Sequence, residues 1–319
     1  LMELQNLSEP LRNHSLVSIF FGGGTPSLMP PELVADLIAE ARKIWPAETE
    51  PEITLEANPT SVEYEKFRDF KAAGINRVSI GVQSFDEKEL KFLGREHNAD
   101  EARTAIKYAG EIFDNYSFDL IYALTTQTPQ GWGKQLKEAL KLADKHISLY
   151  QLTIERGTNF YERKVEVPHD EQAAEFYEVT QNVSKAHGLP AYEISNHAQP
   201  GFESRHNLTY WRYGDYLGIG PGAHGRINGH ATVMTRSPEK WLENPLETNT
   251  LLTEHEKFEE RIMMGIRLKE GLPASLKTRL SNFEMLEKEG FITQQNGRIT
   301  ATKKGFLMLN SLTGKLLEG

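Results

Sequence analysis

The sequence contains no cysteine at all among its 319 residues, which excludes a disulfide framework. It also lacks a basic surplus, because 36 Lys and Arg stand against 45 Asp and Glu, for a net charge of -9. A protein that binds phosphate backbones needs a basic face, so general nucleic-acid binding is excluded. No apolar run reaches the roughly 18 residues of a membrane span, and no secretory signal is visible. We therefore expect a cytoplasmic protein.

The composition is that of a globular protein, with 39% hydrophobic and 25% charged residues. A chain of 319 residues is long enough for one large α/β domain and a smaller one. The chain starts at Leu1 within an amphipathic stretch, and we expect that it lacks an N-terminal part.

Short apolar runs alternate with longer helical patterns over the first two thirds of the chain. The predicted strands, rich in β-branched and aromatic residues, are 15–21, 52–57, 76–82, 117–122, 146–152 and 189–195. The helical patterns cover 30–45, 61–74, 86–94, 99–110, 128–143 and 169–188. This alternation predicts βαβ units and a parallel sheet.

Polar residues and glycines cluster directly after the predicted strands. They lie at Gly22–Thr25, Glu56–Pro59, Gln83–Ser84, Asp119 and Thr153–Glu155. In barrels and in open α/β sheets, ligands bind at the carboxyl ends of the strands. A doubly wound sheet and part of a barrel both fit the alternation. Since every strand contributes such a residue and no single switch point stands out, the pattern favours a barrel.

The pattern changes after about Gly225. Helices are predicted at 237–244, 253–271, 281–290 and 306–317, with a hairpin at 291–305 that turns at Asn296-Gly297. Helices around a hairpin are typical of a winged-helix-like module, and the net acidity favours a cover or scaffold over DNA binding. We expect a partial barrel over 1–228 and a C-terminal helical and hairpin domain over 229–319.

The stretch "FFGGGTPS" carries three glycines between a predicted strand and a predicted helix. Glycines let the backbone approach a ligand closely and expose N–H groups to it. The loop lacks the Lys of a P-loop and the spacing of the dinucleotide fingerprint. A phosphate-binding loop and a plain flexible turn remain alternatives at this point.

Four polar or charged side chains add to this loop. Glu56 suits the two hydroxyls of a ribose, or alternatively the first turn of a helix. Arg95, in "LGREH", suits a carboxylate, although a lone Arg is more often solvated. Asp119 lies among apolar neighbours and requires a partner or a ligand, and Gln83 ends the strand before it. The combination fits a zwitterionic amino acid joined to a nucleoside.

The stretch "RHNLTYW" gathers His206, Asn207, Tyr210 and Trp211, and five glycines follow between Gly214 and Gly225. An imidazole can hold haem iron, aromatic rings pack on a porphyrin, and an amide can fix the imidazole tautomer. The alternative is a structural turn, because most histidines bind no metal. His97, His197 and His224 are further candidates for an iron ligand.

Taken together, these motifs resemble a known family. "IFFGGGTPSLM", "ITLEANP", "NRVSIGVQSF", "LGREH", "SRHNLTYW" and "YLGIGPGAHG" are similar to the radical S-adenosylmethionine proteins related to oxygen-independent coproporphyrinogen III oxidase. The resemblance covers essentially the whole chain. "HNLTYW" resembles the signature of the haem-chaperone branch, the HemW-like proteins. The implied fold is an α/β partial (β/α) barrel followed by a small C-terminal domain.

The resemblance also implies roles for individual residues. Those implied for S-adenosylmethionine are Gly23, Gly24 and Thr25 at the methionine amino group, Glu56 at the ribose, Arg95 at the carboxylate, Gln83 and Asp119 lining the pocket, and Thr153 and His224 at its edge. His206 would contact haem, helped by Asn207, Tyr210 and Trp211. The family also forms dimers, so a homodimer is compatible with the resemblance.

Two features depart from the family pattern. The family holds a [4Fe–4S] cluster with three cysteines before its first helix, and this chain has none. The resemblance implies that the first strand and the cluster loop precede Leu1. "ALTTQT" stands where the family has Gly-Leu-Pro before Gln-Thr.

Three hypotheses for the function of this chain are compared. The first is a haem chaperone that delivers haem to respiratory haem proteins. The second is an oxidoreductase, in which a 5′-deoxyadenosyl radical abstracts hydrogen from a coproporphyrinogen propionate before decarboxylation. The third is an unrelated barrel enzyme that uses Gly22–Thr25 for phosphate. "HNLTYW" favours the chaperone, because the oxidase would leave that stretch without a role.

Overall fold

The computed structural model describes residues 3–4, 11 and 13–318. The chain forms two compact units. One, the sheet unit, comprises Val17–Ala39 and Thr49–Glu203. The other, the second unit, comprises Leu1–Leu16, Glu40–Glu48 and Ser204–Gly319. Among the described residues, no helix is long and apolar enough to cross a membrane.

The break between the units after Glu203 differs from the expected boundary at 228/229. The expected boundary follows the change in sequence pattern after about Gly225, whereas the two units follow the packing of the folded chain. The division into 1–228 and 229–319 therefore stays a prediction.

A six-stranded sheet with the spatial order β1-β2-β3-β4-β5-β6 forms the centre of the sheet unit. The strands are β1 (Ser18–Phe21), β2 (Glu52–Ala57), β3 (Arg77–Gln83), β4 (Tyr116–Tyr122), β5 (His146–Gln151) and β6 (Asn196–Ala198). β1 to β5 pair in parallel and β6 pairs antiparallel to β5. Chain order equals spatial order, as in a (β/α) barrel, and no reversal creates a switch point. The predicted α/β partial barrel is confirmed.

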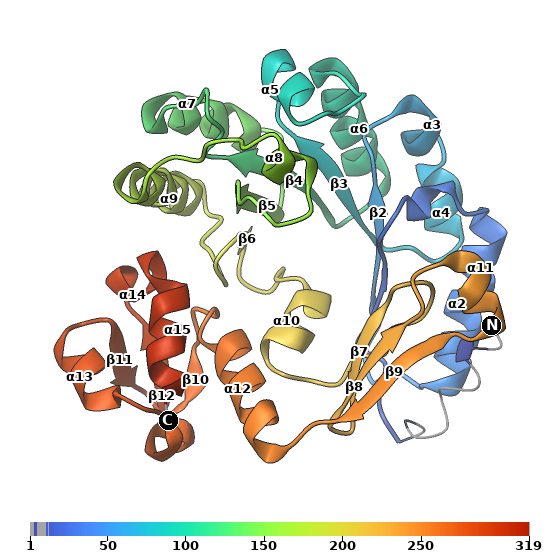
Figure 1. The fold of residues 1–319 in the computed structure, drawn as a ribbon. Helices are drawn as coiled ribbons and strands as arrows, with labels where there is room; N and C mark the ends of the chain where they lie inside the picture. Colours follow the sequence, from blue (N-terminus) through green and yellow to red (C-terminus); the bar gives the residue numbers. More distant parts are fainter. Residues whose placement is uncertain (1–2, 5–10, 12, 319) are drawn as a thin grey trace. The chain divides into compact units, whose positions relative to one another are not determined.

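Helices connect the strands, and the longer ones lie along one face of the sheet (Figure 1). They are η2 (Pro26–Leu28), α2 (Pro31–Ile44), α3 (Ser61–Tyr64), α4 (Phe67–Ala72), α5 (Glu87–Phe92), α6 (Ala99–Ile112), α7 (Pro129–Leu140), α8 (Asn159–Glu162) and α9 (Asp170–Ala186). Local sequence sets their ends. Asn98 and Glu101 form a capping box at α6, and Thr128 accepts the N–H of Gly131 at α7, where Pro129 takes the first helical position.

The strand predicted at 189–195 is wrong. The extended residues are Asn196–Ala198, and the preceding segment turns. The buried Glu193 carboxylate accepts the backbone N–H groups of Ser195 and Asn196. Because a side chain satisfies these donors, the segment does not need a neighbouring strand for them.

The two faces of the sheet differ in polarity. One face packs against the helices and contains the main core residues Ile53, Leu55, Val78, Ile80, Phe118, Leu120, Ile147 and Leu149. Alternation along the strands places on the other face Glu52, Thr54, Glu56, Arg77, Ser79, Ser117, Asp119, His146 and Ser148. Parallel strands are usually apolar on both faces, so a polar face suggests a ligand.

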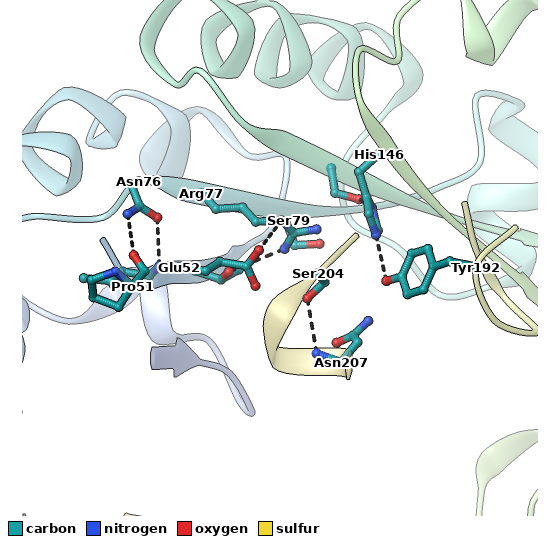
Figure 2. Close-up of polar contacts among 12 residues, drawn as sticks. Pro51, Glu52, Asn76, Arg77, Ser79, His146, Tyr192, Ser204 and Asn207 are labelled. Atoms are coloured by element: carbon teal, nitrogen blue, oxygen red, sulfur yellow. Dashed lines mark hydrogen bonds and ion pairs between the residues drawn. The ribbon is translucent and has the colours of Figure 1, made fainter. Parts of the chain in front are cut away.

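Hydrogen bonds fix this polar face near the start of the strands. Both nitrogens of the His146 ring are hydrogen-bonded (Figure 2). Nδ1 lies 2.7 Å from Ser117 Oγ, and Nε2 lies 3.1 Å from the Tyr192 hydroxyl. Its complete burial lowers its pKa well below the usual value, so the ring stays neutral at neutral pH. Asn76 aligns the start of β2, donating to the Pro51 carbonyl and accepting the N–H of Ile53, each at 2.8 Å.

The second unit holds two antiparallel sheets. Its elements are α10 (Arg205–Trp211), β7 (His224–Ile227), β8 (His230–Met234), α11 (Pro238–Glu243), β9 (Leu246–Leu251), α12 (Glu254–Gly265), β10 (Leu272–Pro273), η3 (Ala274–Arg279), α13 (Phe283–Lys288), β11 (Ile292–Gln295), β12 (Arg298–Ala301), α14 (Lys303–Leu307) and α15 (Leu309–Leu317). The hairpin turning at Asn296-Gly297 is confirmed. The sheet β7-β8-β9 was not predicted.

Candidate functional site

A cavity of about 210 Å³ opens at the carboxyl ends of the first strands of the sheet unit. Its lining residues are Gly24, Pro26, Glu56, Ala57, Asn58, Ser79, Gly81, Gln83, Arg95 and Asp119. The loop after β1, the ends of β2 and β3, and Asp119 within β4 all contribute, because parallel strands present these ends at one edge. Five residues predicted for the site are thus brought together.

The glycine loop approaches Glu56 directly. The N–H of Gly23 donates to Glu56 Oε2 at 3.2 Å. Gly23 and Gly24 have φ values of 77° and 63°, a conformation that other residues rarely adopt. A Cβ at Gly22 would lie 2.6 Å from the Phe20 ring and 3.1 Å from Glu56 Oε2. The loop therefore requires glycine for its conformation and for its contact with the carboxylate, so it is more than a flexible connection.

Two carboxyl groups face the cavity. Burial raises the pKa of Glu56, and the hydrogen bond from Gly23 opposes this shift. Burial also raises the pKa of Asp119, to about 6, where hydrogen bonds from Ser148 and Ser79 oppose the shift and the negative charge of Glu56 adds to it. The Oγ of Ser79 lies 3.4 Å from Asp119 Oδ1. The cavity thus holds two acceptors that a hydroxyl-bearing or cationic ligand would stabilise.

We expect Asp119→Asn to stabilise the ligand-free protein at pH 7. The pKa of Asp119 rises from 3.8 to about 6 on folding, so the folded state binds more protons in that interval. Unfolding free energy therefore falls as the pH rises from about 4 to 6, by at most about 3 kcal/mol. Asn removes this loss. Urea unfolding at pH 7 and pH 4 measures the difference in unfolding free energy between Asp119→Asn and the unchanged protein. This difference should be smaller at pH 4. A difference that is independent of pH would refute the electrostatic cause.

Gln83 lies at a strained end of β3. Its φ is 69°, and the register of β3 against β4 shifts between Ile80 and Gln83. Such a bulge redirects a side chain, and here it places Gln83 in the cavity lining. A non-glycine residue with positive φ costs free energy that the surroundings must supply, and it is a frequent feature of binding sites.

Arg95 is placed by the end of α5. Gly94 has a φ of 70° and the N–H of Arg95 donates to the Leu90 carbonyl at 2.9 Å, which ends the helix in a Schellman arrangement. The side chain is exposed at the cavity. Desolvation by the surrounding cavity wall lowers the pKa of Arg95 and the Asp119 charge opposes this, yet a guanidinium remains charged at neutral pH.

Other predicted residues lie elsewhere. Thr25 precedes η2 and Thr153 is exposed after β5, and neither lines the cavity. His224 begins β7 in the second unit and is exposed. Ser79 and Gly81 line the cavity and were not predicted, whereas Asn58 belongs to the cluster Glu56–Pro59 that was expected at the strand ends. Ser79 and Gly81 follow Arg77 at steps of two along β3, so strand alternation was the signal that would have found them.

Two of the candidate iron ligands are buried in the sheet unit. His97 is 6% exposed, and its Nε2 lies 2.9 Å from the Val82 carbonyl. Burial lowers its pKa, so it is neutral at neutral pH. His197 is fully buried, with Gln181 Nε2 at 3.3 Å from its Nε2. Neither ring is accessible to a haem in this conformation.

The stretch "RHNLTYW" forms the short helix α10. Ser204 caps it by accepting the N–H of Asn207 at 3.3 Å (Figure 2). His206 and Tyr210, four residues apart, lie on the same side, with ring centroids 5.5 Å apart in an edge-to-face arrangement. Both side chains are half-buried. One helix thus presents an imidazole next to a phenol ring.

Trp211, the last residue of α10, anchors this helix through ring contacts. Its ring packs edge-on against Tyr210 at 4.9 Å, and the Arg267 guanidinium lies 5.7 Å from its centroid. Its indole N–H is buried without a hydrogen-bond partner among the described residues. Tyr216 adds a further edge contact to Tyr210 at 6.4 Å. The aromatic cluster holds α10 and forms an apolar neighbourhood for His206.

No cluster of metal ligands is present in the part of the chain that the structure describes, counting groups of three or more His, Cys, Asp or Glu. Because the sequence has no cysteine, this chain supplies no thiolate for an iron–sulfur cluster. The cavity residues can therefore bind and orient an organic ligand, but they do not fit an iron–sulfur cluster.

Comparison with known proteins gives the same regions a family context. The Radical SAM superfamily model matches residues 2–143, and the HemN C-terminal domain model matches residues 252–308. The chain is 38% identical to "Heme chaperone HemW" of Haemophilus influenzae over 97% of this chain and 85% of that protein. The corresponding Escherichia coli protein is 36% identical over 98% of this chain and 87% of its own length.

Related proteins also occur in mitochondria. The Bos taurus protein named "Radical S-adenosyl methionine domain-containing protein 1, mitochondrial" is 36% identical over 94% of this chain and 75% of its own length. Among solved structures, coproporphyrinogen III oxidase (HemN) from Escherichia coli covers 99% of this chain with a TM-score of 0.81 and 20% identity; the match spans 81% of that chain. That structural match shows the fold alone.

Proposed function

Because the chain belongs to the radical S-adenosylmethionine superfamily, in its HemW-like branch, we propose that it is a haem chaperone. It binds S-adenosylmethionine in the strand-end cavity of the sheet unit. It binds haem at α10 and delivers it to respiratory haem proteins. The observation that carries the haem assignment is the pairing of His206 with Tyr210 on α10, in a chain 38% identical to a protein named as a haem chaperone.

The residues around the cavity fit S-adenosylmethionine. Glu56 accepts the ribose hydroxyls, and the charge of Arg95 pairs with the carboxylate of the methionine part. Gly24 lines the cavity, and Gly23, which does not, donates its N–H to Glu56; the negative charge of the Glu56 carboxylate beside this loop suits the positive amino group. Gln83 and Asp119 complete the lining. The ligand's cationic groups also offset the burial of the two carboxyl groups.

The remaining roles implied by the family have less support in the geometry. Thr25, Thr153 and His224 stay predictions, since none of them lines the cavity. Asn207 and Trp211 act on haem indirectly in this proposal, by shaping α10 around His206. The family also implies an iron–sulfur cluster, but its ligands are not residues of this chain.

A coproporphyrinogen III oxidase remains the second candidate. It is favoured by the match of residues 252–308 to the HemN C-terminal domain model. The relatives include proteins named mitochondrial, so a cytoplasmic location also stays a prediction, as do the haem acceptor and a homodimer.

A haem titration followed at the Soret band tests the proposal. We expect saturable binding by the unchanged protein and at least about tenfold weaker binding by His206→Ala, because the axial nitrogen is lost. His255→Ala is the matched control, since His255 is an exposed histidine on α12. Equal affinity in all three proteins, or an absence of saturation, would remove the haem site from the proposal and leave the oxidase as the first candidate.

A further inference from the structure

Two buried carboxylates lie behind the cavity rim and do not line the cavity. Glu63, on α3, is 5% exposed, and Glu89, on α5, is 6% exposed. Neither residue belongs to the cavity lining. A buried carboxylate is costly unless hydrogen bonds compensate it, so the partners of each group show what it holds together.

Glu63 connects the segments that follow β1 and β2. Its Oε2 accepts the Ser27 hydroxyl and the N–H of Asn58, the latter at 2.6 Å. Its Oε1 accepts Asn58 Nδ2 at 3.1 Å. Asn58 lines the cavity, and Ser27 follows the cavity residue Pro26 directly. One carboxylate therefore ties the glycine loop to the end of β2.

Glu89 makes the equivalent connection for β3 and β4. Its Oε2 accepts the Ser84 hydroxyl at 2.5 Å, next to the strained Gln83. Its Oε1 accepts Gln127 Nε2 at 3.0 Å and Gln135 Nε2 at 3.1 Å. Gln127, in the loop after β4, also accepts the N–H of Leu124 at 3.1 Å. The strand ends are thus joined in two pairs, β1 with β2 and β3 with β4.

We propose that Glu63 and Glu89 are positioning residues that preorganise the rim of the cavity for S-adenosylmethionine. Neither touches the ligand. Glu63 acts through Ser27 and Asn58, and Glu89 acts through Ser84 and Gln127. Preorganised groups bind more tightly because the cost of ordering them has already been met on folding. The identity of the ligand in this inference rests on the proposed function. The ordering of the cavity rim by the two carboxylates does not.

Hydrogen exchange tests the structural effect without any ligand. Glu63→Ala should speed amide exchange in 22–29 and 57–60, and Glu89→Ala should speed it in 83–86 and 123–128, each without affecting the other pair. Glu63→Gln and Glu89→Gln keep an accepting oxygen and should restore most of the protection. Exchange that rises equally in both pairs, or in neither, would overturn the inference.

Calorimetric titration of S-adenosylmethionine tests the effect on binding. We expect each Ala variant to bind about tenfold more weakly and each Gln variant to stay within about threefold of the unchanged protein. Leu189→Ala, a core change in the sheet unit, is the control for lost stability alone. Ala variants that bind as tightly as this control would overturn the positioning role. If the unchanged protein does not bind the ligand, the proposed function fails, and the exchange result still decides whether the carboxylates order the rim.

Discussion

Arg95→Met is expected to weaken S-adenosylmethionine binding by roughly 10- to 100-fold, because a charged hydrogen-bonding partner of the ligand carboxylate contributes about 1.5–3 kcal/mol. Arg95 is the basic side chain among the residues that line the cavity in the described part of the chain. Methionine has a similar length and keeps apolar contacts, so the change removes mainly charge and donors. Calorimetric titration measures the loss.

Two further variants sharpen this result. Arg95→Lys keeps the charge but not the planar fork of donors. Its affinity for S-adenosylmethionine should therefore lie between those of the unchanged protein and Arg95→Met. Lys91→Met removes an exposed charge from α5 outside the cavity and should bind as the unchanged protein does. If Arg95→Met and Lys91→Met bind equally well, the ligand carboxylate does not lie at Arg95.

Gly271→Ala is expected to destabilise the second unit by about 2–5 kcal/mol. Gly271 has a φ of 64°, which costs other residues about 1–2 kcal/mol. A Cβ there would also lie 2.1 Å from the carbonyl oxygen of Ile299, which is backbone and cannot rotate away. Overpacking of this kind adds about 1–3 kcal/mol. The pairing of β10 with β12 at Leu272 would be disturbed.

Thermal unfolding followed by circular dichroism measures this effect, with Gly314→Ala as the control. Gly314 lies inside α15, and nothing among the described residues lies within 4 Å of a Cβ built there. Alanine should stabilise that helix by about 0.5–1 kcal/mol. A melting temperature for Gly271→Ala at or above that of the unchanged protein would show that the close approach to Ile299 relaxes without cost.

The sequence predicted the parallel strands because their signal is local. Five strands appear within a few residues of their expected positions, since each is a short run of β-branched and aromatic residues between helical patterns. The segment at 189–195 carries the same residue types. There the buried Glu193 carboxylate accepts the backbone N–H groups two and three residues further along the chain, and the alternation of residue types does not distinguish this local turn from a strand.

The sheet β7-β8-β9 was missed for a related reason. β9 is almost fully exposed and mostly polar, and β7 holds only four residues. Alternation of apolar residues is too weak in such strands to distinguish them from loops. Their pairing depends on each other and not on a strong local preference.

The candidate site was predicted in part. Glu56, Gln83 and Asp119 were found because each is a polar residue in or next to a predicted strand, and Arg95 because its charge suits a carboxylate; the cavity brings the four together. Glu63 and Glu89 look like surface charges in helical sequence. Only the folded chain shows that they are buried and bonded to residues 36 and 38 positions away.

Native mass spectrometry with S-adenosylmethionine and haem tests most directly the claim that one chain binds both. We predict a complex carrying one of each ligand. Arg95→Met should lose S-adenosylmethionine and keep haem, whereas His206→Ala should lose haem and keep S-adenosylmethionine. Complexes without haem under all conditions, or variants that each lose both ligands, would contradict two separate sites on this chain.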